Sequence, residues 1–143
     1  MVTLAEQVAR QRFAAERAAV LGTVGAGGGP HLVPVTFALM DDCVVFAVDH
    51  KPKRTVGLRR LENIRRNPAV SFLADSYDDD WQQLWWVRVD ARASLVADAL
   101  ADNRYEPALD ALAAKYSQYR QLRPSGVVVI AGITGVTGWA WSA

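Results

Sequence analysis

The residues best suited to chemistry lie in one basic stretch of the chain, between Val48 and Pro68. From Lys51 to Arg66 it carries seven cations against a single acid, Glu62, although the formal net charge of the whole chain is only +1. Apolar runs flank this stretch on both sides and are predicted to be buried strands, at Cys43–Val48 and Ala69–Ala74. A basic turn and helix held between two such strands is well suited to receive an anionic ligand.

The cations divide into two groups by their place on the predicted helix, which ends at Asn67-Pro68. Free N–H groups and the positive end of the helix dipole favour anion binding by the cations that precede or open the helix, Lys51, Lys53 and Arg54. The last arginines are assigned to a solvated face, where Arg66 has the i, i+4 spacing for an ion pair with Glu62.

Few other side chains are equipped for catalysis. The two histidines, His31 and His50, and the one cysteine, Cys43, lack metal-ligand spacing, so no metal site is predicted. No serine stands in a nucleophile-elbow context. His50 is a poor general base, because neighbouring cations disfavour a further positive charge on it; a turn or ligand-edge role is expected. The reactive atoms are therefore expected to belong to a bound cofactor.

The glycine-rich segment Gly25–Pro30 is a candidate phosphate loop that fails the test. The dinucleotide fingerprint requires a third glycine where Pro30 stands and must open a helix, and the Walker lysine is missing. The segment opens a β-rich run instead, Leu32–Leu39, so a hairpin turn is predicted. Pro34 within that run indicates an edge strand or a bulge, since proline cannot donate to a sheet ladder.

The clearest alternation of apolar and polar residues runs from Gln83 to Val96. Fourteen residues is long for a strand, as expected where a strand wraps around a barrel and serves two sides of it. Three tryptophans lie close together in this part of the chain, Trp81, Trp85 and Trp86, and a free loop does not expose so much aromatic surface. The segment is therefore expected to contact a ligand or another subunit.

Helices are predicted at two further places. Thr3 and Glu6 form a capping box that opens an alanine-rich helix to about Ala19, with a thin apolar face typical of a helix lying on a surface. A second helix is predicted over Tyr105–Gln121, with an apolar stripe formed by Leu109, Leu112, Tyr116 and Tyr119. Two closing strands joined near Gly132 are predicted to follow it. About seven strands and three peripheral helices, joined mostly by short turns, indicate a mainly β (α+β) protein built as a small antiparallel barrel.

The composition is that of an ordinary globular protein, at 51% hydrophobic and 22% charged residues, and 143 residues suit a single domain over 1–143. No apolar run approaches the ~18 residues of a membrane helix, and charged residues interrupt any signal-peptide core. A cytoplasmic location without a membrane partner is therefore expected. The near-neutral charge argues against a dedicated nucleic-acid binder.

The order of motifs from Val20 onward resembles a known superfamily. It runs through Pro-Val-Thr-Phe, Asp-His-Lys-Pro-Lys-Arg, a helix ending in Asn-Pro, and Asp-Asp-Trp-x-x-Leu-Trp-Trp-Val-Arg. This order is similar to that of the split β-barrel flavin and deazaflavin oxidoreductases, the superfamily of pyridoxamine 5′-phosphate oxidase. The tryptophan run resembles a subgroup of the actinobacterial branch of F420-dependent enzymes.

The resemblance implies an FMN-binding-like split β-barrel that forms a homodimer with two cofactor sites at the subunit interface. By analogy, the region of Lys53 holds the cofactor phosphate and Pro34–Thr36 runs beside the ring system, while the segment Trp81–Arg88 belongs to the interface and completes the partner's site. The expected cofactor-binding residues are Pro34, Val35, Thr36, Asp49, His50, Lys51, Lys53, Arg54, Arg59, Trp81, Trp85, Trp86 and Arg88. Which of Lys51, Lys53 and Arg54 holds the phosphate stays open.

The function expected from the resemblance is an F420-dependent oxidoreductase, with hydride transfer from the reduced deazaflavin to an electron-poor organic acceptor. The cofactor tail, with a phosphodiester and several glutamates, suits a basic strip along Lys51, Lys53, Arg54 and Arg59 better than compact FMN does. One alternative is an FMN-dependent oxidase or reductase of the pyridoxamine-phosphate-oxidase type. Another is a non-catalytic deazaflavin-binding protein, and a nucleic-acid module on the helix Arg59–Arg66 ranks last. No catalytic residue is assigned.

Overall fold

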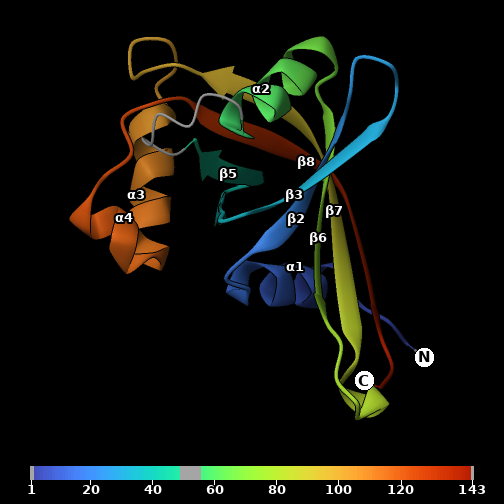
Figure 1. Ribbon diagram of the computed structural model, residues 1–143. Helices are drawn as coiled ribbons and strands as arrows, with labels where there is room; N and C mark the ends of the chain where they lie inside the picture. Colours follow the sequence, from blue (N-terminus) through green and yellow to red (C-terminus); the bar gives the residue numbers. More distant parts are fainter. Residues whose placement is uncertain (1, 49–55, 143) are drawn as a thin grey trace.

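The chain folds into one curled antiparallel sheet with helices around it (Figure 1). The computed structural model describes residues 2–48 and 56–142. Within them, eight strands pair in the order β3-β2-β6-β7-β8-β5-β4, with β1 added beside β8. Five predicted site residues lie outside the described residues: Asp49, His50, Lys51, Lys53 and Arg54.

The strands are β1 (Val2–Thr3), β2 (Ala19–Val24), β3 (Pro30–Val35), β4 (Ala38–Met40), β5 (Cys43–Ala47), β6 (Ala69–Ser76), β7 (Trp85–Val96) and β8 (Val128–Ala140). The helices are α1 (Glu6–Ala15), α2 (Val56–Arg66), α3 (Tyr105–Lys115) and α4 (Ser117–Gln121), and a 3-10 turn, η1 (Trp81–Gln83), precedes β7. None of the helices in the described part is long and apolar enough to cross a membrane.

The two edge strands of the sheet, β3 and β4, are consecutive in the chain and are separated only by Thr36 and Phe37. The sheet therefore curls until its two edges meet at this linker, and among the described residues β3 and β4 do not pair with each other. A barrel left open along one seam is the predicted split β-barrel, and that prediction is confirmed. Pro34 lies on edge strand β3, as predicted, where its missing N–H is tolerated.

Four phenylalanines, from α1, β5, β6 and the linker between β3 and β4, fill the barrel interior. The rings of Phe13 and Phe37 lie 4.5 Å apart between centroids, and those of Phe46 and Phe72 lie 6.1 Å apart. All four side chains are fully buried. Strand β5 is buried on both faces, as its continuously apolar sequence predicts, because Phe46 joins this inner cluster and Val45 joins a second cluster beneath α3.

Two further predictions from local patterns are confirmed. The glycine-rich segment is the turn between β2 and β3, where Gly28 has a φ of 84° and the Gly25 N–H donates to the carbonyl of Gly29 at 2.8 Å. Strand β7 alternates as expected, with Val87 and Val89 buried and Arg88 exposed. It has 12 residues rather than the predicted fourteen, because η1 takes up the start of the run.

The predicted length and cap of the first helix are wrong. Helix α1 ends at Ala15, because Ala19 already belongs to β2 and is in register with β3. The capping box is absent, since Thr3 lies in β1 opposite Trp139 and the N-cap residue, Ala5, makes no side-chain hydrogen bond. Pairing with β8 therefore overrides the local capping signal.

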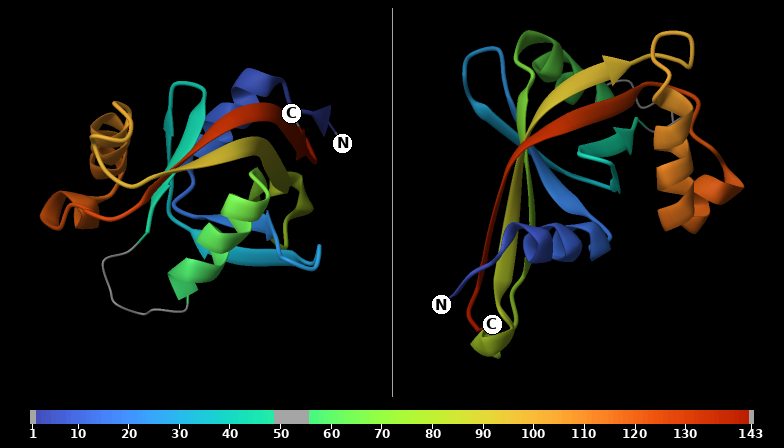
Figure 2. Two further views of the ribbon diagram at one scale, coloured as in Figure 1. Left: turned by 90° about the horizontal axis from the view of Figure 1, so that it is seen from above. Right: turned by 180° about the vertical axis from the view of Figure 1, so that it is seen from behind.

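The predicted thin apolar face of this helix is confirmed, since Ala9 and Phe13 are the only residues of α1 that are buried. Both side chains lie completely within the barrel core, whereas Val8 is 40% exposed. The helix packs across β7 and β8, which is visible in both views of Figure 2. The close approach requires Gly138 on β8, because a Cβ there would lie 2.9 Å from the Cβ of Ala9.

The two closing strands predicted on either side of Gly132 are one strand, β8. It pairs with β5, β7 and β1 along its length. Its irregularity lies two residues further on, at Thr134, where the register with β7 shifts between Asp90 and Ala91. The glycines of this strand do not end it. The strand continues through a β-bulge, and its glycines allow close packing.

The predicted helix over Tyr105–Gln121 is broken into α3 and α4 at Tyr116, whose backbone is extended (φ −119°, ψ 122°). The Tyr116 hydroxyl accepts a hydrogen bond from the Phe37 N–H at 3.1 Å and reaches the carbonyl oxygen of Arg17 at 2.8 Å. These contacts to the seam of the barrel interrupt the helix. Of the predicted apolar stripe, Leu109 and Leu112 are buried, whereas Tyr116 and Tyr119 are half-buried.

Candidate functional site

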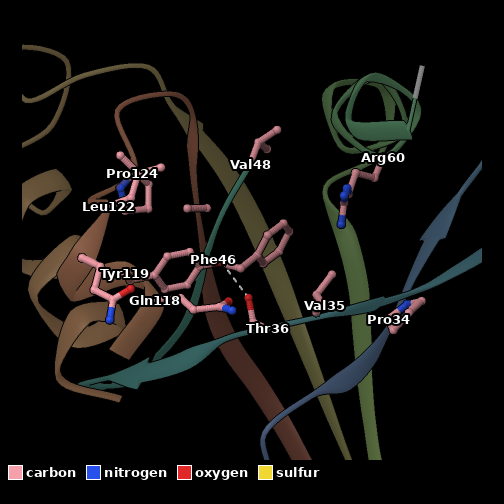
Figure 3. A pocket seen from close by; sticks show the side chains of 12 residues that line it. Pro34, Val35, Thr36, Phe46, Val48, Arg60, Gln118, Tyr119, Leu122 and Pro124 are labelled. Carbon is pink, nitrogen blue, oxygen red and sulfur yellow. Dashed lines mark hydrogen bonds between the residues drawn. The ribbon is translucent and has the colours of Figure 1, made fainter. Parts of the chain in front are cut away.

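A cleft of about 530 Å³ opens between α2 and α4, at the ends of β3 and β5 (Figure 3). This volume is in the range of small-molecule sites, ~300–1,000 Å³. Strand β3 and the residue after it supply Pro34, Val35 and Thr36, and β5 and the residue after it supply Phe46, Ala47 and Val48. The remaining lining residues are Arg60 from α2 and, from α4 and the chain after it, Gln118, Tyr119, Gln121, Leu122 and Pro124.

The predicted basic segment is bordered in the sequence by Val48 and by α2, and both contribute to this cleft. Val48 lines the cleft, and its N–H donates to the carbonyl of Val127 at 3.0 Å. The chain is described again at Val56, where α2 begins. Residues 49–55, with the predicted phosphate-binding cations, therefore connect the cleft to the helix that carries Arg60.

Among the described residues, Arg60 is the cation that lines the cleft, with its side chain extending from α2 (Figure 3). Its Nε is buried and has no hydrogen-bond partner among the described residues. Burial lowers the pKa of the Arg60 guanidinium, and the electrostatic influence of Tyr119 partly offsets this. A buried donor without a partner costs about 1–3 kcal/mol, so its position in a cleft indicates a ligand group that supplies the missing acceptor.

The opposite wall of the cleft is held by a pair of tyrosines. The hydroxyl groups of Tyr119 and Thr36 lie 2.8 Å apart, drawn as a dashed line in Figure 3. The ring of Tyr119 packs edge-on against that of Tyr116, with centroids 5.6 Å apart. Because Tyr116 is itself bound to the backbone of Phe37, α4 is fixed to the end of β3.

Of the predicted site residues, Pro34, Val35 and Thr36 lie in this cleft. Arg59 does not line it: its exposed side chain lines a separate groove of about 700 Å³ between α2 and the β2–β3 turn. Arg66 lines the same groove. The predicted ion pair between Arg66 and Glu62 is present at 3.9 Å, with both side chains exposed.

Trp81 belongs to η1 and Trp85 is the first residue of β7. This end of β7 lies away from α2 and α4 (Figure 1). Trp81 is 62% exposed and packs edge-on against Trp141, with ring centroids 5.9 Å apart. Arg12 of α1 lies over the ring of Trp85, with its Cζ 5.8 Å from the centroid. Neither tryptophan lines the cleft in this chain.

Trp86 and Arg88 point to the other face of β7, where they line a shallow depression of about 570 Å³. Three exposed aliphatic side chains gather on the same surface, Val20, Leu32 and Leu73. Within one chain, therefore, the structure does not bring the predicted residues of β7 to the cleft.

Sequence reasoning did not select Arg60 or Tyr119. Arg60 precedes the buried Ile64 by one helical turn, a spacing that places it beside the buried face of α2. This signal was available in the sequence. Tyr119 was assigned to the apolar stripe of a continuous helix, and the break at Tyr116 that turns it into the cleft has no local signal.

Among the described residues, no group of three histidine, cysteine or acidic side chains is placed to hold a metal ion. The polar side chains among the described lining residues are one guanidinium, two hydroxyl groups and the amides of Gln118 and Gln121.

A curled antiparallel sheet that is open at one seam, with a cleft beside that seam, defines the split β-barrel class. The chain belongs to the pyridoxamine 5′-phosphate oxidase family, whose family model matches residues 5–139. A search of functionally curated proteins finds no match.

Solved structures show the same fold. A FAD-binding protein from Mesorhizobium loti is 21% identical, with a TM-score of 0.72 over 96% of this chain and 93% of that one. The FAD-binding protein from Mycobacterium smegmatis is also 21% identical, with a TM-score of 0.64 over 99% of this chain and 100% of that one. A conserved hypothetical protein from Mycobacterium tuberculosis is 22% identical, with a TM-score of 0.70 over 96% and 85% of the two chains.

Proposed function

We propose that the protein is an F420-dependent reductase of the actinobacterial branch of this superfamily. It binds the deazaflavin in the cleft between α2 and α4 and reduces an electron-poor organic acceptor. The observation that carries the proposal is the buried, unpartnered Nε of Arg60 in a cleft of cofactor size. A cation in that state fits a phosphate, which supplies acceptor oxygens and a negative charge, since none of the described lining residues is acidic.

Each wall of the cleft has a role in this proposal. Arg60 holds the cofactor phosphate together with cations of the adjoining segment, Lys51, Lys53 and Arg54. The strand end Pro34–Thr36 runs beside the ring system, and the apolar side chain of Phe46 packs near it. The bound deazaflavin supplies two-electron hydride chemistry that no side chain of the protein provides.

The preference for F420 over FMN rests on the distribution of charge around α2. Arg59 and Arg66 line a groove on another side of the helix that carries Arg60. Glu62 neutralises them only in part, because its exposed ion pair with Arg66 at 3.9 Å is weak. A long tail with several carboxylates can use these cations, whereas the single phosphate of FMN is satisfied at Arg60.

An FMN-dependent oxidase or reductase is the second candidate. The likeness to two structures described as FAD-binding proteins favours a flavin in this cleft. A deazaflavin-binding protein without catalytic activity is the third, since Arg60 accounts for binding but not for turnover.

The proposed assembly is a homodimer with cofactor sites at the subunit interface. The exposed apolar surface around Trp86, with Val20, Leu32 and Leu73, suits burial against a second copy of the chain. Docking there would let the segment Trp81–Arg88 of one copy complete the cleft of the other. This accounts for a tryptophan-rich strand that lies away from the cleft of its own chain.

Side-by-side titration of the purified protein with F420 and FMN tests the proposal. We expect a change of deazaflavin fluorescence that saturates and weakens with added salt, and a dimer by sedimentation. Single-turnover reduction of an acceptor panel then separates an enzyme from a binding protein. Tight binding of FMN, or a protein that is yellow as purified, would establish the second candidate. Failure to bind either cofactor would overturn the assignment.

A further inference from the structure

The groove between α2 and the β2–β3 turn contains a histidine that the proposed cofactor does not explain. The groove holds about 700 Å³, within the range of small-molecule sites, ~300–1,000 Å³. Helix α2, which packs against β2 (Figure 2), forms one wall. The turn forms the other, where a Cβ added at Gly27 or Gly29 would meet nothing within 4 Å. This wall is therefore open to a ligand.

The sheet becomes polar where it reaches this groove. On β2, Ala19 and Leu21 belong to the buried core, but Thr23 takes the next position on that face. Thr23 pairs in register with His31 of β3. Asn63 of α2 is buried above the same point, and its Nδ2 donates to the Thr23 Oγ1 at 3.0 Å. This buried hydrogen bond fixes α2 over the end of the β2–β3 hairpin.

His31 is left without a partner in this polar cluster. Its side chain lines the groove and its residue is half-buried, but its Nδ1 is buried and has no hydrogen-bond partner among the described residues. The hydrogen bond between Asn63 and Thr23 does not include it. A buried polar atom without a partner is costly, so its place in a groove indicates a ligand that hydrogen-bonds with the imidazole.

Two arginines bring positive charge to the same groove. Arg59 and Arg66 both line it. They are seven residues apart, which is about 10 Å along a helix and nearly the same side of it. Asn63 lies between them on α2, so the His31 imidazole has an arginine towards each end of the helix. Glu62 is the one acid among the described lining residues, and its exposed ion pair with Arg66 at 3.9 Å is weak.

We propose that this groove is a second anion site, separate from the cleft, and that it binds the phosphate group of a small phosphate monoester. The three terminal oxygens of such a phosphate match three donors, the guanidinium groups of Arg59 and Arg66 and the imidazole of His31, which donates from both nitrogens when it is protonated. A carboxylate has two oxygens and leaves one donor unused. The open wall at the turn accommodates the organic part of the ligand. The site goes beyond the proposed function, whose cofactor tail needs only the exposed arginines.

The first test is an NMR titration of the imidazole nitrogens of the full chain, without cofactor, with ribose 5-phosphate. We expect a saturable shift of the His31 signals, identified by their absence in His31→Gln. Ribose, which lacks the phosphate, should give no shift, and the dicarboxylate glutarate should bind about 10-fold more weakly, as for loss of one charge-assisted hydrogen bond. A shift confined to His50, in the basic segment, would overturn the proposal. Equal affinity for glutarate would overturn the choice of phosphate.

The second test is calorimetric titration of variants with ribose 5-phosphate. Arg59→Gln and His31→Gln should each weaken binding about 10- to 100-fold, whereas Glu62→Gln should tighten it, because it removes the acid that opposes the anion. Arg65→Gln, which removes an exposed cation of the same helix that does not line the groove, is the matched control. Binding that is lost in Arg60→Gln and kept in Arg59→Gln would place the phosphate in the cleft and overturn the proposal. Neither test uses F420, so their failure leaves the cofactor assignment intact, and failure to bind F420 leaves this site intact.

Discussion

Replacement of Arg60 by methionine should make the free protein more stable and its cofactor binding weaker. Arg60→Met removes the guanidinium and keeps an unbranched apolar side chain in place of the arginine stem. In the structure this guanidinium brings a buried Nε that no described residue satisfies. The side chain therefore carries an energetic cost in the free protein that a bound anion can offset.

The size of the two effects follows from the burial of Arg60. An unsatisfied buried donor costs about 1–3 kcal/mol, and the low end applies because the side chain is only partly buried. We therefore expect a gain of about 1 kcal/mol, or about 3 °C in Tm for a chain of this length. Loss of a charge-assisted hydrogen bond of about 1.5–3 kcal/mol should weaken binding about 10- to 100-fold.

Urea denaturation of the apoprotein measures the first effect, and fluorescence titration with F420 measures the second. The control is Arg65→Met, which removes an exposed cation from the same helix and should change both quantities little. An Arg60→Met protein that is less stable than wild type yet binds the cofactor with unchanged affinity would refute the reasoning. Arg60 would then be a structural residue.

Two further predictions concern stability. Burial lowers the pKa of Lys115 to about 8, although its Nζ lies 3.8 Å from the ring centroid of Phe37, a contact that favours the charge. Because the unfolded chain keeps the proton up to a higher pH, the penalty is full below about pH 8 and is relieved above it. Lys115→Met should thus stabilise the protein near pH 7 and much less near pH 10; a gain independent of pH in urea denaturation would contradict this. Gly138→Ala should cost about 1–3 kcal/mol by overpacking, since the new Cβ would lie 2.9 Å from that of Ala9. Gly27→Ala has open space and should cost nothing, so equal losses in thermal denaturation would refute the packing argument.

The parts of the fold that the sequence predicts are those set by local periodicity. The alternation along β7 indicates that one face of the strand is buried, and the continuous apolar run of β5 indicates that both faces are buried. Neither inference depends on which elements cover those faces. The turn at Gly28 and the edge position of Pro34 follow from backbone chemistry that a single residue determines.

The parts that the sequence does not predict depend on contacts between distant segments. Thr3 has the pattern of a helix cap but pairs with β8, and Tyr116 has the pattern of a helix interior but binds the backbone of Phe37. The glycines of β8 resemble breaks until α1 is seen to pack on Gly138. In each case tertiary contacts override the local preference.

The candidate site was predicted only in part, because it too depends on contacts between distant segments. The order of motifs identified the strand end Pro34–Thr36, which lies in the cleft. It did not separate Arg59 from Arg60, because adjacent helix positions differ by about 100° around the axis and only the docking of α2 decides which enters the cleft. The assignments to Lys51, Lys53 and Arg54 stay predictions.

The free edge of β3 bears on how copies of this protein can associate. Pro30 and Pro34 lie four residues apart on that strand and lack N–H groups. Of the three alternate residues Pro30, Leu32 and Pro34, only Leu32 therefore has a backbone donor. A strand from another molecule would find too few partners there to extend the sheet, which discourages ribbon-like aggregates. Association is thereby directed to faces of the molecule, where it can stop at a closed pair.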